Sequence, residues 1–454
     1  MKKVEFSRSV INDANEIVEK CMADEPAFCQ SECPMHTDAR GYVTLVAEKK
    51  YDEAIKLIRQ ELFLPNTLGR ICPHPCERVC RRGRDVDQPI AIKDIKRFVA
   101  EKADKEEIWD LSTNDNTGKR VAIIGAGPAG AQAAIDLRKK GHIVTIFEKL
   151  NEVGGMMRLK VSPQRLPREI IDYEYSYLNK LGIKFELGKE IGKDIKFSEL
   201  IKKYDVVLLA YGIRRENKEK KENKENNDDF IKDITFGIIE QTNEGRYIVD
   251  EETLSTQLDN VFVAGSLCGG RMVVESMALG RKAAISMDRF LKGIDLKENR
   301  DFTKEWSYET KLDIPLPEGI ENKPRINGDR ITGLTEEEAI KEASRCLNCK
   351  CGLCMNECIM MNDFGKSPKD IVKSLVDSSE INPLIPYSCS GCSMCRKVCP
   401  KSLPINEVFM NARKDFVKAN KGESPFKGHL GVNIHQKLSF SKVFSTKKKG
   451  NDKS

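Results

Sequence analysis

The stretch that decides the fold is residues 121–149, VAIIGAGPAGAQAAIDLRKKGHIVTIFEK. It begins with a short apolar run, which is typical of a buried parallel strand. Gly125, Gly127 and Gly130 then stand at G-x-G-x-x-G spacing and open a predicted helix. The first glycine permits a tight turn, the second lets a phosphate approach the backbone, and the third allows close packing of helix and strand. The stretch therefore predicts a strand–helix–strand unit that binds a dinucleotide.

Two features after the glycines support this prediction. The N-terminus of the helix would offer unpaired N–H groups and the positive end of its dipole to phosphate. Glu148 ends the next predicted strand, where a carboxylate accepts hydrogen bonds from ribose hydroxyls. A glycine-rich turn that binds no nucleotide is the alternative, and the register of strand, glycines, helix, strand and acid argues against it.

Later segments extend the same unit. Residues 204–212, YDVVLLAYG, and 260–270, NVFVAGSLCGG, each form an apolar run that ends at glycine, and Gly154 and Gly155 follow Glu148 closely. Together these features resemble the flavoproteins with two dinucleotide sites, whose first fingerprint holds FAD. By that resemblance the expected FAD-binding residues are Gly125, Ala126, Gly127, Pro128, Ala129, Gly130, Glu148, Lys149, Gly155, Met156, Arg158, Gly265, Ser266, Met272 and Val273.

The sixteen cysteines fall in two groups. Six lie between Cys21 and Cys80, nine lie between Cys346 and Cys399, and only Cys268 stands between the groups. A disulfide scaffold is normally short and secreted, so grouped cysteines in a chain of this length favour metal binding over disulfides. Cys268 is expected to be a small buried residue and not a redox thiol.

The C-terminal group carries a ferredoxin spacing. Cys389, Cys392, Cys395 and Cys399 follow the pattern C-x2-C-x2-C-x3-C-P, in which the last cysteine reaches a neighbouring cluster. We therefore expect one [4Fe–4S] cluster on Cys358 with the first three. A second would use Cys399 and three of a set that leaves one thiol spare: Cys346, Cys349, Cys351 and Cys354. Four-thiolate zinc sites are the alternative. The segment resembles the dicluster module of heterodisulfide reductase small iron–sulfur subunits.

Four further segments carry a wider resemblance: CPMHTDARGYV, NTLGRICPHPCERVCRRG, PIAIKDIKRFVAE and GGMMRLKVSPQRLPREI. They are similar to the glutamate synthase small-subunit family, which includes the ferredoxin–NADP transhydrogenase large subunit and the N-terminal part of dihydropyrimidine dehydrogenase. The resemblance implies an α/β FAD-binding Rossmann-type domain, like that of flavoprotein disulfide reductases, flanked by two mainly α-helical iron–sulfur domains. It implies up to two N-terminal clusters, one on Cys21, Cys29 and Cys80 and the other on Cys33, Cys72 and Cys76.

The chain departs from this family at four places. Asp24 replaces a cysteine, Lys96 replaces a glutamate or glutamine, and Ser266 replaces an aspartate that contacts FAD. The fourth departure is the charged segment 214–233, a predicted mobile loop that stands where the family has a whole NAD(P)H domain. About 20 residues cannot form a βαβ domain, so the usual nicotinamide site is expected to be missing.

The remaining sequence sets the organisation. Residues 7–20 and 38–62 have the apolar repeat of amphipathic helices. The expected domains are a helical cluster domain (1–118), an FAD domain (119–296), a linker (297–335), a dicluster domain (336–420) and a basic tail (421–454). A net charge of +6 gives no case for nucleic acid. Without a signal peptide or a run of about 18 apolar residues, a soluble cytoplasmic protein without a membrane span is expected.

These patterns suggest an iron–sulfur flavoprotein oxidoreductase subunit in a hetero-oligomer. It would pass electrons between FAD and [4Fe–4S] clusters, to or from a ferredoxin-type, heterodisulfide reductase-like or dehydrogenase partner. No catalytic side chain is expected, because the cofactors carry the chemistry. One alternative is an NAD(P)H-dependent oxidoreductase whose nicotinamide binds at the flavin face or on another chain. The other is a binding or structural protein whose cofactor sites have decayed.

Overall fold

A computed structural model describes residues 4–213, 234–235, 237–242, 245–300, 310, 312–316, 319–429, 431, 434–435 and 438. The charged segment 214–233 and most of the predicted basic tail lie outside these residues. The chain divides into two compact units. Unit 1 contains Met1–Glu25, Lys311–Leu316 and Lys350–Ser454, and unit 2 contains Pro26–Thr310 and Pro317–Cys349.

Unit 2 contains a parallel sheet built from the expected strands. Its five strands, in the order β3-β2-β1-β4-β5, are all parallel. Their bounds are β1 (Arg120–Ile124), β2 (Ile143–Glu148), β3 (Lys184–Leu187), β4 (Val206–Leu209) and β5 (Val261–Val263). The strand order reverses between β1 and β4, and dinucleotides bind at such a switch point. The structure thus confirms the expected Rossmann-type sheet.

Helices cover this sheet. Helix α9 (Pro128–Lys139) follows the glycine turn, and α13 (Val273–Leu291) packs against it. A side chain on Gly280 of α13 would place its Cβ 2.2 Å from the Ala129 carbonyl oxygen, so glycine is what permits this contact. The other elements of this part are α10 (Met156–Lys160), α11 (Arg168–Lys180), α12 (Phe197–Lys203) and η2 (Gly265–Cys268).

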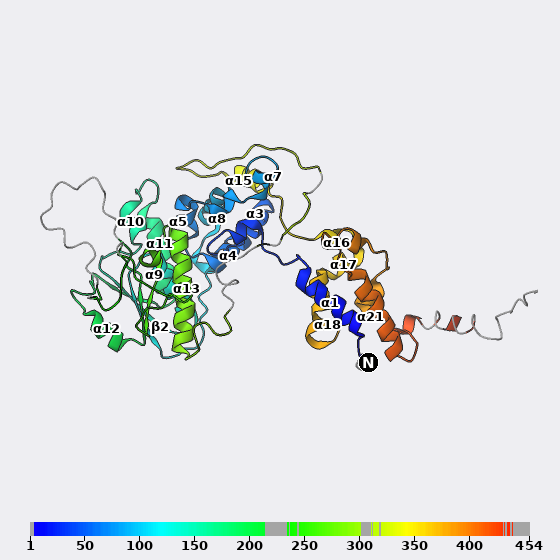
Figure 1. Ribbon diagram of the computed structural model, residues 1–454. Helices are drawn as coiled ribbons and strands as arrows, with labels where there is room; N and C mark the ends of the chain where they lie inside the picture. Colours follow the sequence, from blue (N-terminus) through cyan, green and yellow to red (C-terminus); the bar gives the residue numbers. More distant parts are fainter. Residues whose placement is uncertain are drawn as a thin grey trace, which may run out of the picture. The chain divides into compact units, whose positions relative to one another are not determined.

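The first part of unit 2 is helical (Figure 1). Its elements are α2 (Phe28–Ser31), α3 (Ala39–Ala47), α4 (Tyr51–Glu61), α5 (Pro65–Ile71), α6 (Pro75–Arg78), α7 (Arg81–Asp85), α8 (Ile92–Ala103) and η1 (Glu106–Ile108). The expected single helix over 38–62 is wrong. Lys49 adopts a left-handed conformation (φ 62°), which ends α3, and Lys50 donates its N–H to the Leu45 carbonyl before α4 begins.

Helix α5 is anchored on the sheet part by one carboxylate. Glu174 of α11 is fully buried and accepts hydrogen bonds from the N–H groups of Asn66 (2.6 Å) and Thr67 (3.2 Å). These two N–H groups belong to the first turn of α5, where helical donors lack partners within the helix. The helical part of unit 2 is therefore tied directly to the Rossmann-type part. A further helix of unit 2 is α15 (Glu336–Ala343).

Unit 1 joins the first helix of the chain to the C-terminal segment. Helix α1 (Arg8–Lys20) packs against α18 (Pro368–Ser378) and α21 (Ile405–Ala419), and Phe6 contacts the ring of Phe416 with centroids 5.5 Å apart (Figure 1). The shared core includes Val10, Ile17 and Phe409. The other elements are α16 (Leu353–Asn356), α17 (Ile359–Phe364), α19 (Leu384–Ser388), α20 (Met394–Lys397) and η3 (Lys427–His429).

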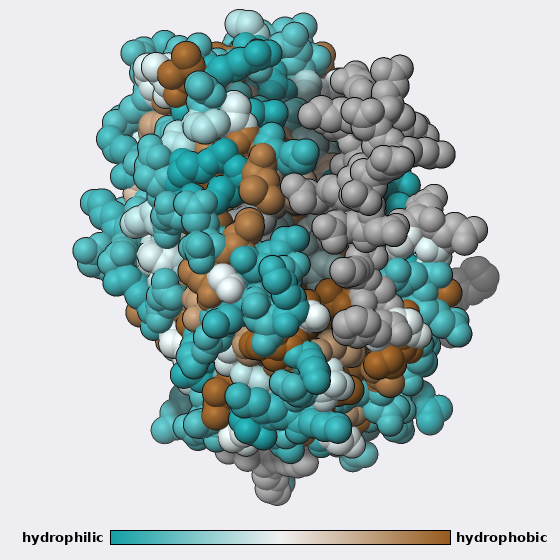
Figure 2. All heavy atoms as spheres, turned by 90° about the vertical axis from the view of Figure 1, so that its left-hand side faces the viewer, coloured by the Kyte–Doolittle hydropathy of each residue, from teal (hydrophilic) through white to brown (hydrophobic). Residues whose placement is uncertain are grey.

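The described surface is mostly polar. On the face in Figure 2 the coloured atoms are mainly hydrophilic, and hydrophobic groups form separate patches between them. Large exposed apolar side chains such as Leu159, Ile248 and Ile331 are scattered along the chain. Among the described residues, no helix combines the length and the apolar character that crossing a membrane requires.

Candidate functional site

The glycine turn after β1 lies at the carboxyl edge of the sheet where the strand order reverses, the position that we call the crevice. Gly125 has φ 108°, and a Cβ there would lie 2.6 Å from the Ala210 carbonyl oxygen. The Ala126 N–H donates to Oε2 of Glu148 at 2.8 Å, while the Leu150 N–H donates to its Oε1 at 3.0 Å. A carboxylate has about four lone-pair positions, so Glu148 retains capacity to accept from a ribose hydroxyl.

Open space remains beside the second glycine. A Cβ on Gly127 would meet only the Ala210 carbonyl oxygen, at 4.0 Å, whereas a Cβ on Gly130 would come within 2.1 Å of the Gly125 carbonyl oxygen. Gly155 lies next to this space, since its Cβ would be 3.0 Å from the Gly127 Cα. The chain thus leaves a cradle at Gly127 of the kind that a pyrophosphate needs.

The ends of β4 and β5 meet on one side of the crevice. The Ile213 N–H donates to Oγ of Ser266 at 2.9 Å, and Gly265 has φ 74°. Met272 and Val273 open α13, with the Met272 N–H bonded to Glu275. Cys268 donates its thiol to the Gly265 carbonyl at 3.4 Å, and burial raises its pKa to about 12. Cys268 is partly buried, and the expectation that it is not a redox thiol stays a prediction.

Three of the predicted contact residues have other surroundings. The Arg158 guanidinium donates to the Val153 carbonyl at 2.8 Å and pairs with Asp172. Lys149 is exposed, and Met156 is partly exposed at the start of α10. Arg158 is therefore held by the protein, and its contact with a dinucleotide stays a prediction.

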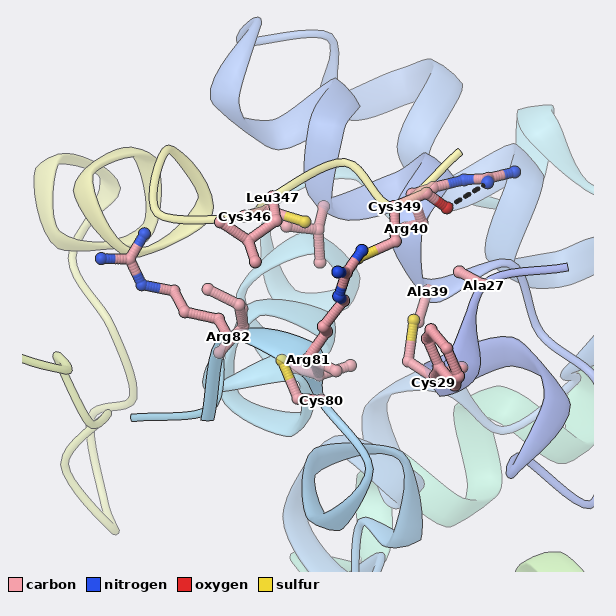
Figure 3. A pocket seen from close by; sticks show the side chains of 14 residues that line it. Ala27, Cys29, Ala39, Arg40, Cys80, Arg81, Arg82, Cys346, Leu347 and Cys349 are labelled. Atoms are coloured by element: carbon pink, nitrogen blue, oxygen red, sulfur yellow. Dashed lines mark hydrogen bonds between the residues drawn. The ribbon is translucent and has the colours of Figure 1, made fainter. Parts of the chain in front are cut away.

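Four cysteines surround one pocket of unit 2 (Figure 3). We call them the Cys29 set: Cys29, Cys80, Cys346 and Cys349. Burial raises the pKa of Cys29 well above its usual value, and the charges of the other three raise it further. Arg40, Arg81 and Arg82 also line this pocket, which gives it a basic wall.

Three more cysteines line a second pocket of unit 2, together with Cys29. They form the Cys33 set: Cys33, Cys72 and Cys76. Lys96 lines the same pocket and is only 7% exposed. Burial raises the pKa of the Cys76 thiol, and the Lys96 ammonium opposes that rise. The fourth side of this set is thus occupied by a cation that cannot donate to iron.

Unit 1 holds the remaining cysteines in two neighbouring sets. Burial, together with the charge of nearby cysteines, raises the pKa of Cys354 to about 12. With these neighbours it forms the Cys21 set: Cys21, Cys351, Cys354 and Cys399. Burial likewise raises the pKa of Cys395 to about 11, and its nearest cysteines complete the Cys358 set: Cys358, Cys389, Cys392 and Cys395.

The grouping agrees with the sequence in part. The Cys33 and Cys358 sets are the ones that the spacing and the resemblance suggested. The expected combination of Cys21 with Cys29 and Cys80 stays a prediction; Cys21 belongs to unit 1, whereas Cys29 and Cys80 belong to unit 2. Two of the four C-terminal candidates, Cys346 and Cys349, line the unit 2 pocket, and which of the four is spare stays untested. Spacing could not reveal this, since the partners are hundreds of residues apart.

The backbone beside these cysteines has a recurring geometry. The N–H of His74 faces the sulfur of Cys72 at 3.4 Å, and the N–H of Gly391 faces that of Cys389 at 3.4 Å. The same i+2 pattern relates Ala23 to Cys21, Asn348 to Cys346, Leu353 to Cys351 and Met394 to Cys392. N–H groups aimed at sulfur stabilise thiolates and tune the potential of an iron–sulfur cluster.

The sets do not have the geometry of single-ion sites. In the parts of the chain that the structure describes, no three of the His, Cys, Asp and Glu side chains come close enough to hold one metal ion. A tetrahedral zinc site would bring its sulfurs to within about 4 Å of one another. Cysteines spaced around a pocket instead fit a group of several atoms. The Cys29 and Cys33 sets, which line pockets, have room for such a group.

Three family models match the chain. Residues 3–108 match dihydropyrimidine dehydrogenase domain II, 4Fe-4S cluster; residues 123–186 match an NAD(P)-binding Rossmann-like domain; and residues 336–404 match a 4Fe-4S dicluster domain. The chain therefore contains 4Fe-4S domains on both sides of a Rossmann-like domain. This confirms the fold class and the iron–sulfur prediction.

Curated relatives confirm the resemblance to the glutamate synthase small-chain group. The NADP(+)-dependent formate dehydrogenase subunit beta of Moorella thermoacetica is 37% identical over 42% of this chain and 30% of its own length. The NADPH-Fe(3+) oxidoreductase subunit beta of Geobacter sulfurreducens is 34% identical over 52% of this chain and 37% of its own. The glutamate synthase [NADPH] small chain of Escherichia coli is 33% identical over 43% of this chain and 42% of its own length. The chain spans less than half the length of each relative.

Proposed function

We propose that this chain is an electron-transfer subunit in which FAD binds at the crevice of the sheet and [4Fe–4S] clusters bind at the cysteine sets. One observation carries the proposal. The Cys29 and Cys33 sets lie in the same compact unit as the dinucleotide crevice. Glu174 ties the two parts of that unit together through the first turn of α5. A flavin site and cluster sites in one unit support electron transfer between them.

The residues of the crevice have distinct roles in this proposal. The turn Gly125–Gly130 and the first turn of α9 would bind the pyrophosphate, because the cradle at Gly127 is open and the α9 N-terminus faces it. Glu148 would accept from the ribose. Gly265 and Ser266, beside the end of β4, would border the flavin end, with Met272 and Val273 at the start of α13. A bound flavin would supply the exchange between two-electron and one-electron carriers.

The proposed partners are redox proteins in a hetero-oligomer. The first two relatives are subunits by name, which supports an assembly. In unit 1, Cys392 is exposed, so the Cys358 set reaches the surface of that unit. Lys397, two positions after Cys395 in the chain, is exposed, whereas Arg396 is paired with Glu407. A ferredoxin-type or heterodisulfide reductase-like partner with an acidic docking face would fit this surface.

A second function rests on a specific observation. The family model for residues 123–186 is described as NAD(P)-binding, and two of the relatives carry NADP in their names. The described residues form one parallel sheet with one such crevice. In this second function FAD still binds at the crevice, and the nicotinamide binds at the flavin face or on another chain, so the two functions predict different reductants of the same flavin.

Anaerobic titration of the reconstituted chain distinguishes the electron-transfer subunit from the NAD(P)H-dependent oxidoreductase. Flavin absorbance is followed while reduced ferredoxin, NADPH or NADH is added in separate runs. Bleaching by ferredoxin and not by either nicotinamide supports the electron-transfer subunit. Rapid bleaching by NADPH supports the oxidoreductase instead. A chain that retains no flavin contradicts the proposed use of the crevice.

A further inference from the structure

The boundaries between the two units cut through both cysteine groups. One boundary, between residues 25 and 26, separates Cys21 from Cys29, and another, between residues 349 and 350, separates Cys349 from Cys351. The arrangement expected from the sequence would keep Cys21 with Cys29 and would draw the C-terminal ligands from the C-terminal group alone. We propose that the two groups exchange ligands: Cys346 and Cys349 complete a cluster with Cys29 and Cys80, and Cys21 completes one with Cys351, Cys354 and Cys399. This inference rests on the proposed function, in which clusters bind at these sets.

The Cys29 set has the composition that this exchange requires. All four thiols line a single pocket of unit 2. Cys346 and Cys349 enter this pocket from the C-terminal segment, while Cys29 and Cys80 line it from the N-terminal helical part. Four thiolates are the complete ligand set of a [4Fe–4S] cluster. This pocket therefore needs no ligand from Cys21 or from Asp24.

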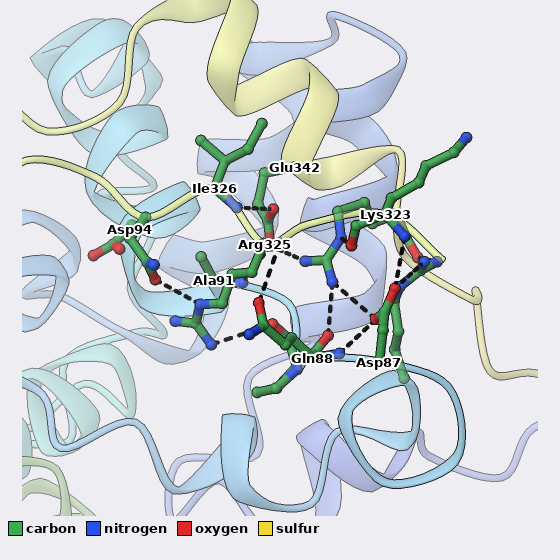
Figure 4. A network of polar contacts seen from close by, with 12 residues as sticks. Asp87, Gln88, Ala91, Asp94, Lys323, Arg325, Ile326 and Glu342 are labelled. Carbon is green, nitrogen blue, oxygen red and sulfur yellow. Dashed lines mark hydrogen bonds and ion pairs between the residues drawn. The ribbon is translucent and has the colours of Figure 1, made fainter. Parts of the chain in front are cut away.

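The segment before Cys346 is fixed on the N-terminal helical part by a buried polar network (Figure 4). Arg345, only 2% exposed, pairs with Glu342 at 2.6 Å and with Asp87 at 3.0 Å. It also donates to the Gln88 carbonyl at 2.8 Å. Glu342 is fully buried and accepts from the Ala91 N–H at 2.8 Å. Buried charges are retained where they are paired in this way.

Two arginine side chains hold the ends of the loop 346–349 by donating hydrogen bonds to its backbone carbonyl groups. Arg82 donates to the Arg345 carbonyl at 2.7 Å, and Arg40 donates to the Cys349 carbonyl at 2.7 Å. Arg82 is itself paired with Asp87 at 2.6 Å. The loop is thus pinned against α3 and α7 on either side of the two thiols. Such anchoring has a purpose if the loop supplies ligands to a site on those helices.

Cys21 has an equally defined place in unit 1. It lies at the C-terminal end of α1, is buried, and receives the backbone N–H groups of Ala23 and Lys369. Cys354 is buried in the same core of unit 1 as Cys21, and Cys399 packs against that core. Packing of α1 against α18 and α21 holds Cys21 there. The first helix of the chain therefore brings one thiol to the C-terminal cluster region.

In the proposed arrangement Asp24 is not a ligand of the Cys29 set. Its side chain is 63% exposed and pairs with Lys369 at 2.8 Å, within unit 1. The carboxylate is therefore engaged at the surface. The family has cysteines at positions 21 and 24 for this cluster. In the proposed arrangement Cys346 and Cys349 supply these two ligands instead.

Paired cysteine variants of the full chain test the exchange. The chain is purified and reconstituted anaerobically, and iron per chain is measured for each variant. Cys29→Ser and Cys346→Ser should each lose one cluster, or about four iron atoms, and their double variant should lose no more. Cys29→Ser with Cys21→Ser should lose two clusters, or about eight. Cys268→Ser is the matched control and should retain all iron.

The opposite pattern would overturn the inference. If Cys29→Ser with Cys21→Ser loses one cluster while Cys29→Ser with Cys346→Ser loses two, the family arrangement holds. Cys29→Asp and Cys346→Asp guard against misfolding, because each keeps an oxygen ligand. They should shift the same electron paramagnetic resonance signal, and shifts in two different signals would contradict the exchange. A wild-type chain that binds no iron would instead defeat the proposed function itself.

Discussion

Arg40 donates a hydrogen bond from Nη1 to the carbonyl oxygen of Cys349 at 2.7 Å, although 309 positions separate the two residues in the chain. The contact places a C-terminal cysteine loop beside an N-terminal helix. It explains why a pocket in the N-terminal helical part contains four thiols although the N-terminal sequence supplies only two of them. The predictions below follow from this placement and from the crevice of the sheet.

Replacing Arg345 should loosen the cysteine loop. Arg345→Met removes the partner of Glu342 and of Asp87, both of which are charged and withdrawn from solvent. Breaking a buried pair in this way costs about 3–5 kcal/mol. We expect a lower urea midpoint for unit 2 and loss of iron from the Cys29 set. Arg330→Met, at an exposed position of the same segment, is the control and should change neither. An unchanged midpoint and iron content in Arg345→Met would refute the anchoring role.

The residue at position 96 should determine whether the cluster on the Cys33 set keeps its fourth iron atom. With three thiolates, one iron atom lacks a protein ligand, so mild oxidation should remove it. Lys96→Cys supplies a fourth thiolate at a position that lines the same pocket. The variant should retain about one more iron atom per chain after ferricyanide treatment and lose the three-iron signal. Lys102→Cys, on the exposed face of the same helix, is the control. Equal iron loss in Lys96→Cys and the wild type would be the contrary result.

Two glycine variants should separate binding from folding. Gly127→Ala adds a methyl group to open space, so the free energy of unfolding should change little. The same methyl group would occupy the cradle proposed for pyrophosphate, so FAD binding should weaken by at least about tenfold. Gly130→Ala places its Cβ 2.1 Å from the Gly125 carbonyl oxygen and should destabilise the fold itself. The measurements are the flavin content and the urea midpoint of both variants. Full flavin retention by Gly127→Ala would place the nucleotide elsewhere.

Glu174 should give unit 2 a pH-dependent stability. Burial raises its pKa from 4.5 to about 7, although the Asn66 and Thr67 N–H groups oppose the rise. Between these pH values the folded chain keeps a proton that the unfolded chain has released. The contribution of Glu174 is therefore full below about pH 4.5 and is lost as the pH rises through 7, a change of about 3 kcal/mol.

Urea unfolding of Glu174→Gln across this pH range tests whether Glu174 makes the stability of unit 2 fall as the pH rises. The neutral amide cannot titrate, so the fall in the urea midpoint between pH 4.5 and 7 should become shallower than in the wild type. Glu169→Gln, on the exposed side of α11, should keep the wild-type slope. An identical slope in the Glu174 variant would mean that another group is responsible.

The sequence predicted the local features of the fold well. Gly125, Gly127 and Gly130 with Glu148 mark the first strand–helix–strand unit, because each residue answers a local demand of backbone geometry or phosphate access. The ends of β4 and β5 also lie where the apolar runs indicated. The break at Lys49 was missed, because an amphipathic repeat continues through it and only one left-handed residue interrupts the helix.

Ligand grouping could not be predicted from spacing alone. Cys346 and Cys351 stand five positions apart yet belong to different units. What separates them is tertiary: Arg345 and Glu342 fix one on the N-terminal helices, while the other lies with Cys399. The signal that could have suggested this is the buried charge pair E-x-x-R directly before the first cysteine. An acid and a base that are both buried must contact another part of the chain, but the sequence does not show which part that is.

The most direct test of the account is the cofactor content of the full chain. Iron, acid-labile sulfide and flavin are measured per chain after anaerobic purification and reconstitution. Four clusters and one flavin predict about fifteen to sixteen iron atoms, the lower value applying if the Cys33 set keeps only three, with one FAD. A chain that holds zinc without iron, or about eight iron atoms without flavin, would contradict the account.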